Sequence, residues 1–292
     1  MSSVLTVQTP AKINPVLEVL RKRDDGYHEL ALVFQAIGVH DELSFAPGHG
    51  VQLTLAGPHS TLAVDDSNLV VKAARLFLSE TGDHRHGVHI TLKKKIPVAA
   101  GLGGGSSDAA ATLRGLNWFF KTGFPEDKLH ALAAQLGSDV PFFLAGGSAL
   151  GTGRGEKITP WPAGPEIPLV VVKPEEGLST PAVYQSGKAV MTSGDKAKAF
   201  ASVLQGGRLE EVAKGLYNGL EAAALALMPE IDVIKKQLLD AGALGALVSG
   251  SGPTVFALAG SKAKAEEIAW KLEGEGWTVF VTTTISSGVE RI

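Results

Sequence analysis

The segment Pro97–Asp108 has the residue types of a phosphate-binding loop. It contains four glycines and two serines, namely Gly101, Gly103, Gly104, Gly105, Ser106 and Ser107. An alternating strand pattern at residues 88–92 precedes it, and apolar residues at helical spacing follow it. Glycine backbone lets N–H groups approach an anion closely, and the start of a helix adds positive potential. The pattern therefore predicts phosphate binding where a strand passes into a helix.

Two better-known phosphate motifs do not fit this loop. The Walker pattern ends in Gly-Lys-Ser/Thr, whereas this loop ends in Gly-Ser-Ser, and the dinucleotide fingerprint needs a glycine where Ser106 stands. The alternative is a plain strand–helix turn with Ser106 or Ser107 as the helix N-cap. A plain turn needs only one or two glycines, and every further glycine costs backbone entropy when it is ordered. The number of glycines favours phosphate binding.

Two charged residues outside the loop suit phosphoryl transfer to a hydroxyl. Lys12 lies in the segment Pro10–Asn14, and Asp139 follows Ser138 before an apolar run at residues 140–144. Read alone, Lys12 is an exposed lysine at a strand end and Asp139 an acid in the first turn of a helix. Beside a phosphate loop, Asp139 suits a base that accepts the hydroxyl proton, and Lys12 suits a cation that offsets developing charge.

The three histidines His84, His86 and His89 have a spacing that resembles a metal site. Without cysteine partners, and at a connection between helix and strand, they indicate a solvated turn instead. The sequence offers no evident second carboxylate for a metal, so the protein ligands of any metal stay unknown.

Apolar periodicity outlines the scaffold of the first half. Strand patterns cover residues 4–7, 16–20, 30–39, 43–45 and 51–55. The first two of these leave Lys12 between two strands. Helix patterns follow at residues 70–78, after the glycine loop, at 126–136 and from 139. A glycine-rich stretch at 146–155 and a proline cluster at 160–165 predict a domain boundary.

Strands and helices alternate in the second half. Strand patterns cover 169–172, 246–248, 254–258 and 278–283, and helix patterns lie near 196–204, 209–216, 220–226, 230–241 and 262–274. We therefore expect two domains, residues 1–160 with the phosphate loop and residues 161–292 as an α/β sandwich. A second glycine cluster at 250–253 is either a tight loop or backbone close to the same ligand.

Composition narrows the class of protein. The chain of 292 residues is 45% hydrophobic, and 27 basic and 30 acidic residues give a net charge of −3. This balance argues against a general nucleic-acid or membrane-surface binder, although Lys93–Lys95 concentrate positive charge before the glycine loop. The lack of cysteine excludes disulfides and thiolate chemistry. With no signal-peptide pattern and no membrane-spanning apolar run, the sequence predicts a cytoplasmic protein.

Three blocks of the sequence resemble the GHMP kinase family. They are Pro10–Asn14 with Asp25–Leu30, the loop Pro97–Ala109, and Gly250–Thr254, with further support from Leu136–Phe142. The resemblance spans nearly the whole chain. It implies an α+β, two-domain GHMP kinase fold with the active site in the inter-domain cleft. It also implies transfer of the γ-phosphate of ATP to the 2-hydroxyl of cytidine diphosphate methylerythritol, in the non-mevalonate route to isoprenoid precursors, with Mg²⁺ bridging phosphate oxygens.

The resemblance also assigns roles to single residues. Lys12 and Asp139 match the catalytic pair of the family. The resemblance assigns substrate contacts to Asn14, Tyr27, His28 and Tyr184. In this assignment His28 recognises the cytosine, and both tyrosines lie beside that base. ATP binding falls to Asn68, Lys94, Pro97, Val98, Ala99, Ala100, Gly101, Leu102, Gly103, Gly104, Gly105, Ser106 and Ser107. Pro15 departs from the family, which usually has an aliphatic residue there, and it removes a backbone donor.

Two alternatives stay open at this point. One is a related small-molecule kinase acting on mevalonate or homoserine, but those substrates offer no base to Tyr27, His28 and Tyr184. The other is a nucleotide-binding regulator without catalysis, which would need neither Lys12 nor Asp139.

Overall fold

The structure is a computed structural model that describes residues 4–57, 62–82, 87–162 and 164–292. Within these residues the larger of two sheets has eight strands, in the order β12-β1-β2-β4-β3, with β5 on β2, β6 on β5 and β8 on β1. Their bounds are β1 Leu5–Lys22, β2 His28–Pro47, β3 Val51–Ala56, β4 Val88–Lys93, β5 Ser148–Gly153, β6 Lys157–Trp161, β8 Tyr217–Asn218 and β12 Glu290–Arg291.

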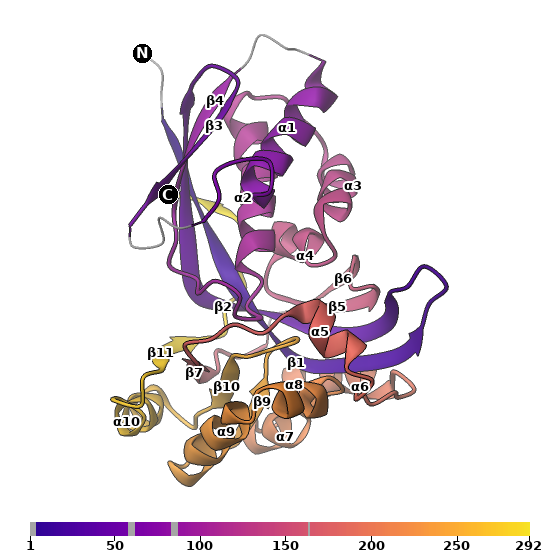
Figure 1. The fold of residues 1–292 in the computed structure, drawn as a ribbon, viewed down its shortest axis with the longest axis vertical. Helices are drawn as coiled ribbons and strands as arrows, with labels where there is room; N and C mark the ends of the chain where they lie inside the picture. The colour runs from indigo at the N-terminus through magenta and orange to yellow at the C-terminus, as the bar shows by residue number, and fades with distance from the viewer. Residues whose placement is uncertain (1–3, 58–61, 83–86, 163) are drawn as a thin grey trace.

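Four helices cover one face of the larger sheet (Figure 1). They are α1 Leu69–Thr81, α2 Gly104–Phe119, α3 Glu126–Leu136 and α4 Val140–Ala145. Helix α2 is rich in alanine and packs closely against β2. The approach is so close that a Cβ at Gly115 would lie 2.4 Å from the ring of Phe45. Burying this alanine face against β1 and β2 fixes the start of α2, and with it the glycine loop, relative to the sheet.

The smaller sheet has the strand order β11-β7-β10-β9 and occupies the lower half of Figure 1. Its strands are β7 Pro168–Lys173, β9 Gly245–Val248, β10 Val255–Leu258 and β11 Thr278–Thr283. The helices of this part are α5 Thr180–Gln185, α6 Asp195–Gly206, α7 Leu209–Lys214, α8 Glu221–Leu227, α9 Glu230–Asp240 and α10 Lys262–Lys271.

Strand alternation divides the smaller sheet between two hydrophobic layers. Leu169 and Val171 of β7 pack in the layer that includes Ile13 of β1. Val170 and Val172 point the other way, into the layer formed with α9 and α10. The smaller sheet thereby lies against the middle of β1.

The structure corrects two local expectations. Lys12 does not lie between two strands, because β1 runs without a break from Leu5 to Lys22. The β1–β2 register shifts between Ile13 and Val16, so Pro15 sits at an irregularity where its missing donor is tolerated. The glycine-rich stretch at 146–155, expected to mark a domain boundary, mostly forms β5 in register with β2.

The sheets cross the expected domain boundary. A division at residue 160 falls inside β6. From the second half, Asn218 pairs in parallel with Leu17, and Glu290 pairs with Gln8. Separate domains at 1–160 and 161–292 remain a proposal, and the strand pairing follows that division only in part.

No helix within the described ranges is both long and apolar enough to cross a bilayer.

Candidate active site

A cavity of about 1240 Å³ lies where the glycine loop, β1 and the C-terminal half meet. Its lining contains all the residues that the sequence analysis assigned to catalysis, ATP or substrate, with the single exception of Ser107. Tertiary folding therefore brings together segments near residues 12, 28, 68, 100, 139 and 184.

The glycine loop adopts backbone angles that other residues rarely take. Gly101 has φ +73° and Gly103 has φ +72°. A Cβ at Gly101 would lie 2.4 Å from the carbonyl oxygen of Ser249, and one at Gly103 would lie 2.7 Å from the ring of Phe143. Gly103 is itself the N-cap of α2 and has no side-chain cap, so the alternative with Ser106 or Ser107 as N-cap is wrong. The first N–H groups of α2 are left for a ligand.

Ser107 departs from the assigned ATP contact. Its side chain is fully buried, donates to the Pro10 carbonyl at 2.6 Å and shares a 2.6 Å hydrogen bond with the Thr9 hydroxyl. These partners lie on β1, away from the cavity lining. Ser107 therefore fastens the first turn of α2 to β1, while the Ser106 side of the helix borders the cavity.

The proposed catalytic pair is assembled on β1 and at the start of α4. Lys12 Nζ lies 3.5 Å from Asp139 Oδ2 and donates to Asn14 Oδ1 at 2.6 Å. The Lys12 side chain is 5% exposed, whereas that of Asp139 is 34% exposed. Asn14 is held in turn by a 3.1 Å bond to the Val33 carbonyl. The result is a fixed cation beside an accessible carboxylate.

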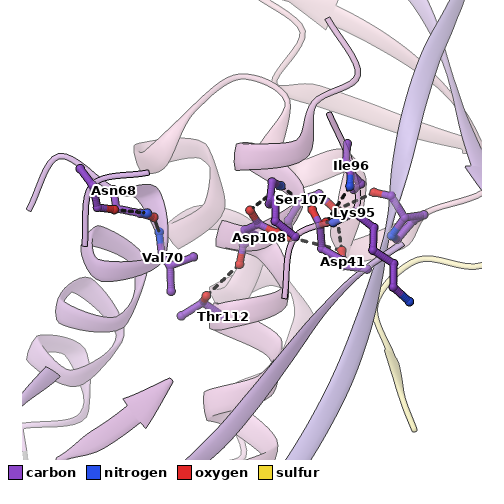
Figure 2. Close-up of polar contacts among 12 residues, drawn as sticks. Asp41, Asn68, Val70, Lys95, Ile96, Ser107, Asp108 and Thr112 are labelled. Atoms are coloured by element: carbon purple, nitrogen blue, oxygen red, sulfur yellow. Dashed lines mark hydrogen bonds and ion pairs between the residues drawn. The ribbon is translucent and has the colours of Figure 1, made fainter. Parts of the chain in front are cut away.

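Lys94 is held between two carboxylates beneath the glycine loop. Its Nζ donates to Asp41 and, at 2.8 Å, to Asp108 of α2. Asp41 also accepts the backbone N–H groups of Lys95 at 2.6 Å and Ile96 at 2.8 Å (Figure 2). Residues just before the glycine loop and just after it are thus tied to one buried cluster, which explains how a loop so rich in glycine keeps one shape.

Burial dominates the electrostatics of this cluster. It raises the pKa of Asp108 to about 8, helped by the negative charge of Asp41 and opposed by Lys94. Burial lowers the pKa of Lys94, but Asp108 and Asp41 raise it by more, so its pKa lies above the ordinary value. Lys94 keeps its charge, and its contacts with Asp41 and Asp108 commit that charge to the protein itself.

Asn68 serves mainly as a helix cap in this structure. Its Oδ1 accepts the N–H of Val70 at 2.9 Å, as Figure 2 shows, and its Nδ2 donates to the Ala63 carbonyl at 2.7 Å. Its place in the cavity lining agrees with a position near the nucleotide.

Aromatic residues also line the cavity. His28 of β2 stacks on Tyr184 of α5 with 5.0 Å between ring centroids. Burial lowers the pKa of His28, and nearby Lys22 adds to that shift, so a neutral ring is favoured. Burial also raises the pKa of Tyr184. Tyr27 is 56% exposed and lies under the guanidinium of Arg154 at 4.9 Å.

Sequence reasoning missed several residues that line the cavity. Asp108, Arg154 and Thr180 were given no role. The Thr180 hydroxyl shares a 2.7 Å hydrogen bond with that of Ser251, which lies in the second glycine cluster that the sequence placed either in a tight loop or close to the ligand. Asp108 is the last residue of the glycine-rich segment 97–108, so its position offered a signal for a role near the site. Arg154 and Thr180 carry no local signal, because strand pairing and the placement of α5 bring them to the site.

The described side chains contain no group of three or more His, Asp or Glu arranged to hold a metal. His89 shares a 2.8 Å hydrogen bond with the Thr54 hydroxyl, while His84 and His86 lie outside the described residues.

Comparison with known proteins agrees with this geometry. Residues 68–147 match the GHMP kinases N terminal domain, and residues 197–276 match the GHMP kinases C terminal domain. The 4-diphosphocytidyl-2-C-methyl-D-erythritol kinase of Pelotomaculum thermopropionicum is 45% identical over 284 residues, covering 97% of this chain and 99% of that protein. The enzyme of the same name from Moorella thermoacetica is 43% identical over 288 residues, with 97% and 99% coverage.

Solved structures extend the comparison to the fold. A crystal structure of 4-(cytidine 5'-diphospho)-2C-methyl-D-erythritol kinase has a TM-score of 0.76 and 34% identity, covering 97% of this chain and 99% of that one. Homoserine kinase from Cytophaga hutchinsonii has a TM-score of 0.81 at 22% identity, covering 100% of this chain and 98% of that one. At this identity the similarity shows only that the two proteins share a fold. The α+β fold expected from the sequence is confirmed. The chain belongs to the GHMP kinase family, in the branch of the 4-diphosphocytidyl-2-C-methyl-D-erythritol kinases.

Proposed function

We propose that this protein transfers the γ-phosphate of ATP to the 2-hydroxyl of 4-diphosphocytidyl-2-C-methyl-D-erythritol, a step toward isoprenoid precursors. One observation carries the proposal. A single cavity is lined by the glycine loop, by Lys12 and Asp139, and by the stacked rings of His28 and Tyr184. A phosphate donor, a reacting hydroxyl and a nucleobase each find suitable chemistry in this cavity.

In the proposed mechanism, Asp139 accepts the proton of the substrate hydroxyl as its oxygen attacks the γ-phosphorus. Asp139 is the accessible member of the pair, which suits a base that must reach substrate. Lys12, fixed by Asn14, faces the charge that develops around the acceptor oxygen. The N–H groups at the start of α2 hold the phosphates of ATP in line with that oxygen. ADP leaves with the broken bond's electron pair.

The cavity also fits a magnesium ion bound together with ATP. The Ser106 side chain borders it, and its hydroxyl is an oxygen ligand of the kind that Mg²⁺ accepts. Since the described residues contain no cluster of three candidate ligands, phosphate oxygens and water would complete the coordination. When bound, Mg²⁺ neutralises part of the phosphate charge.

We place the base of the substrate at His28 and Tyr184, with Tyr27 on its other face. A neutral His28 can both donate and accept a hydrogen bond, which suits the polar edge of cytosine. Because the reaction consumes ATP and the chain has no cysteine, we place the protein in the cytoplasm, with small molecules as its partners and neither nucleic acid nor membrane among them.

A coupled assay of ADP release tests the function directly. We expect release that depends on the cytidine substrate, with mass spectrometry of the product locating one added phosphate on the 2-hydroxyl. Homoserine and mevalonate serve as competing acceptors. Turnover of either in preference to the cytidine compound would favour the related-kinase alternative. ATP binding without turnover of any acceptor would favour a regulator.

A further inference from the structure

The C-terminal glycine loop, residues 249–252, lies directly against the proposed catalytic pair. Gly250 has φ +59°, and a Cβ placed on it would lie 3.2 Å from Lys12 Nζ and 3.4 Å from Asn14 Oδ1. The Ser249 hydroxyl donates to the Gly101 carbonyl at 3.1 Å. The loop at residues 249–252 therefore borders the space around Lys12 and also contacts the glycine loop at Gly101. A shift of the loop would change how Lys12 meets the transferring phosphate.

The side chain of Asn218 holds this loop in place. Its Nδ2 donates to the carbonyls of Gly250 and Val248, both at 2.8 Å. Its Oδ1 accepts the N–H of Leu220 at 2.9 Å. The partners fix the orientation of the amide, because the nitrogen faces two acceptors and the oxygen faces a donor. The residue is 7% exposed, so water competes little for these bonds.

Asn218 is in turn anchored to the strand that carries Lys12. It pairs with Leu17 in the parallel contact between β8 and β1, and the next residue, Gly219, donates its N–H to the Leu17 carbonyl at 2.8 Å. Asn218 does not line the cavity itself. One buried amide thus ties the glycine loop of the smaller sheet to β1.

We propose that Asn218 is a positioning residue for phosphoryl transfer, which sets Gly250 against Lys12 without touching substrate. The role of Asn218 rests on the proposed function. Its loss should impair the chemical step more than ligand binding, since a misplacement of about 1 Å costs on the order of a hundred-fold in rate.

The decisive variants are Asn218→Asp and Asn218→Ala. We expect kcat to fall roughly ten- to a hundred-fold in both, with KM for ATP within about three-fold of the parent. The carboxylate cannot donate and faces two carbonyl oxygens, but it regains one donor on protonation. The kcat of Asn218→Asp should therefore recover relative to Asn218→Ala as the assay pH is lowered. A purely structural defect would not produce that difference in pH profile.

Asn117→Asp is the matched control. Asn117 also bridges backbone with its amide, accepting from the Phe124 N–H at 2.9 Å and donating to the Phe124 carbonyl at 3.0 Å, but outside the cavity lining. It should lower thermal stability and leave kcat unchanged. An equal loss of kcat in the control, or a parental kcat in the Asn218 variants, would overturn the proposal. If Asn218→Asp does not fold, Asn218→Ala and the hydrogen exchange described below still test the proposal.

Hydrogen–deuterium exchange over residues 246–254 provides a readout that needs no substrate. We expect faster exchange in the Asn218 variants and the parental rate in Asn117→Asp. Unchanged exchange in the Asn218 variants would show that Asn218 does not hold the loop in place. If the parent protein fails to phosphorylate the cytidine compound, the proposed function falls, while the exchange result still decides whether Asn218 holds the loop.

Discussion

At the scale of single residues, the contrast between Lys12 and Asp139 defines the proposed chemistry. The two groups lie 3.5 Å apart, yet Lys12 is buried and tied to Asn14 while Asp139 faces the cavity. A buried, immobile cation suits stabilisation of charge in the transition state, because it needs no rearrangement during the reaction. An accessible carboxylate suits proton transfer with a substrate that must enter and leave.

Asp139→Asn is expected to reduce kcat by about a hundred- to ten-thousand-fold, because the amide has the same shape but cannot accept the proton. Steady-state kinetics together with calorimetric binding of ATP and of the cytidine substrate would separate chemistry from binding, and both affinities should stay near the parent value. A variant that keeps more than a tenth of the parental rate would show that Asp139 is not the base.

Tyr184→Ala is expected to raise KM for the cytidine substrate by roughly ten- to a hundred-fold, since stacking on a base is worth about 1–3 kcal/mol. Affinity for ATP should hardly change. His28→Ala should do the same and also weaken discrimination between cytosine and uracil, because a polar edge of the base loses its partner. CDP should compete with the cytidine substrate, and competition against ATP alone would place the base elsewhere.

At the scale of elements, the glycine loop and the start of α2 form one phosphate-binding unit, whose shape is enforced from both ends. Asp41 and Lys94 hold the residues before the loop, and Ser107 and Asp108 hold the residues after it. The glycines of the loop carry no side chains, which leaves their backbone free to approach an anion.

Gly103→Val should weaken ATP binding far more than binding of the cytidine substrate. Gly103 has φ +72°, and a Cβ there would lie 2.7 Å from Phe143 and 3.0 Å from Lys12 Cγ, so a branched side chain strains the backbone and crowds the site. Separate calorimetric titrations of the two ligands measure the effect, with circular dichroism to verify the fold. Equal loss of both affinities would indicate misfolding instead.

Asp108→Asn is expected to remove a pH dependence of stability. The pKa of Asp108 is raised from 3.8 to about 8, chiefly by burial. Between about pH 4 and pH 8 the folded protein therefore keeps a proton that the unfolded chain has released, and the stability that this group contributes falls as pH rises through that window. The variant stays neutral, so its melting temperature relative to the parent should increase toward pH 8. A flat difference in melting temperature across this pH range for Asp108→Asn would contradict the assignment.

At the scale of the whole molecule, the long strand β1 connects the parts that must cooperate. It carries Lys12 and Asn14, pairs with β8 beside the smaller sheet, and pairs with β12 at its other end. The C-terminal segment also reaches the larger sheet, where Ile285 donates its N–H to the Ala36 carbonyl at 2.9 Å. Chain segments from both halves therefore build one site.

Removing residues 286–292 should lower the melting temperature by roughly 5–10 °C. The deletion exposes the surface that Val289 covers and removes the pairing of β12 with β1, losses of about 1.5–3 kcal/mol for one apolar side chain and about 1 kcal/mol for each hydrogen bond. Thermal melting followed by circular dichroism measures the change. Removing only Ile292, which is 63% exposed, is the control. Parental stability after the longer deletion would support an independent domain at 1–160.

The sequence by itself determined the local features and the family. The glycines of residues 101–105 predicted a loop where a strand passes into a helix. Most helices could be placed because their periodic apolar faces depend only on neighbours a few residues away. The motifs at residues 10–14, 25–30 and 97–109 were specific enough to indicate the family, which the comparisons confirm.

Only the tertiary structure decided which distant groups meet. It merged the expected short strands into β1 and β2, directed Ser107 toward β1, and paired Lys94 with Asp41 and Asp108. It also brought Gly250 against Lys12. These contacts depend on strand register and on the packing of one sheet against another, which join residues far apart in the chain. Local patterns constrain only the residues within one element, so they cannot specify such contacts.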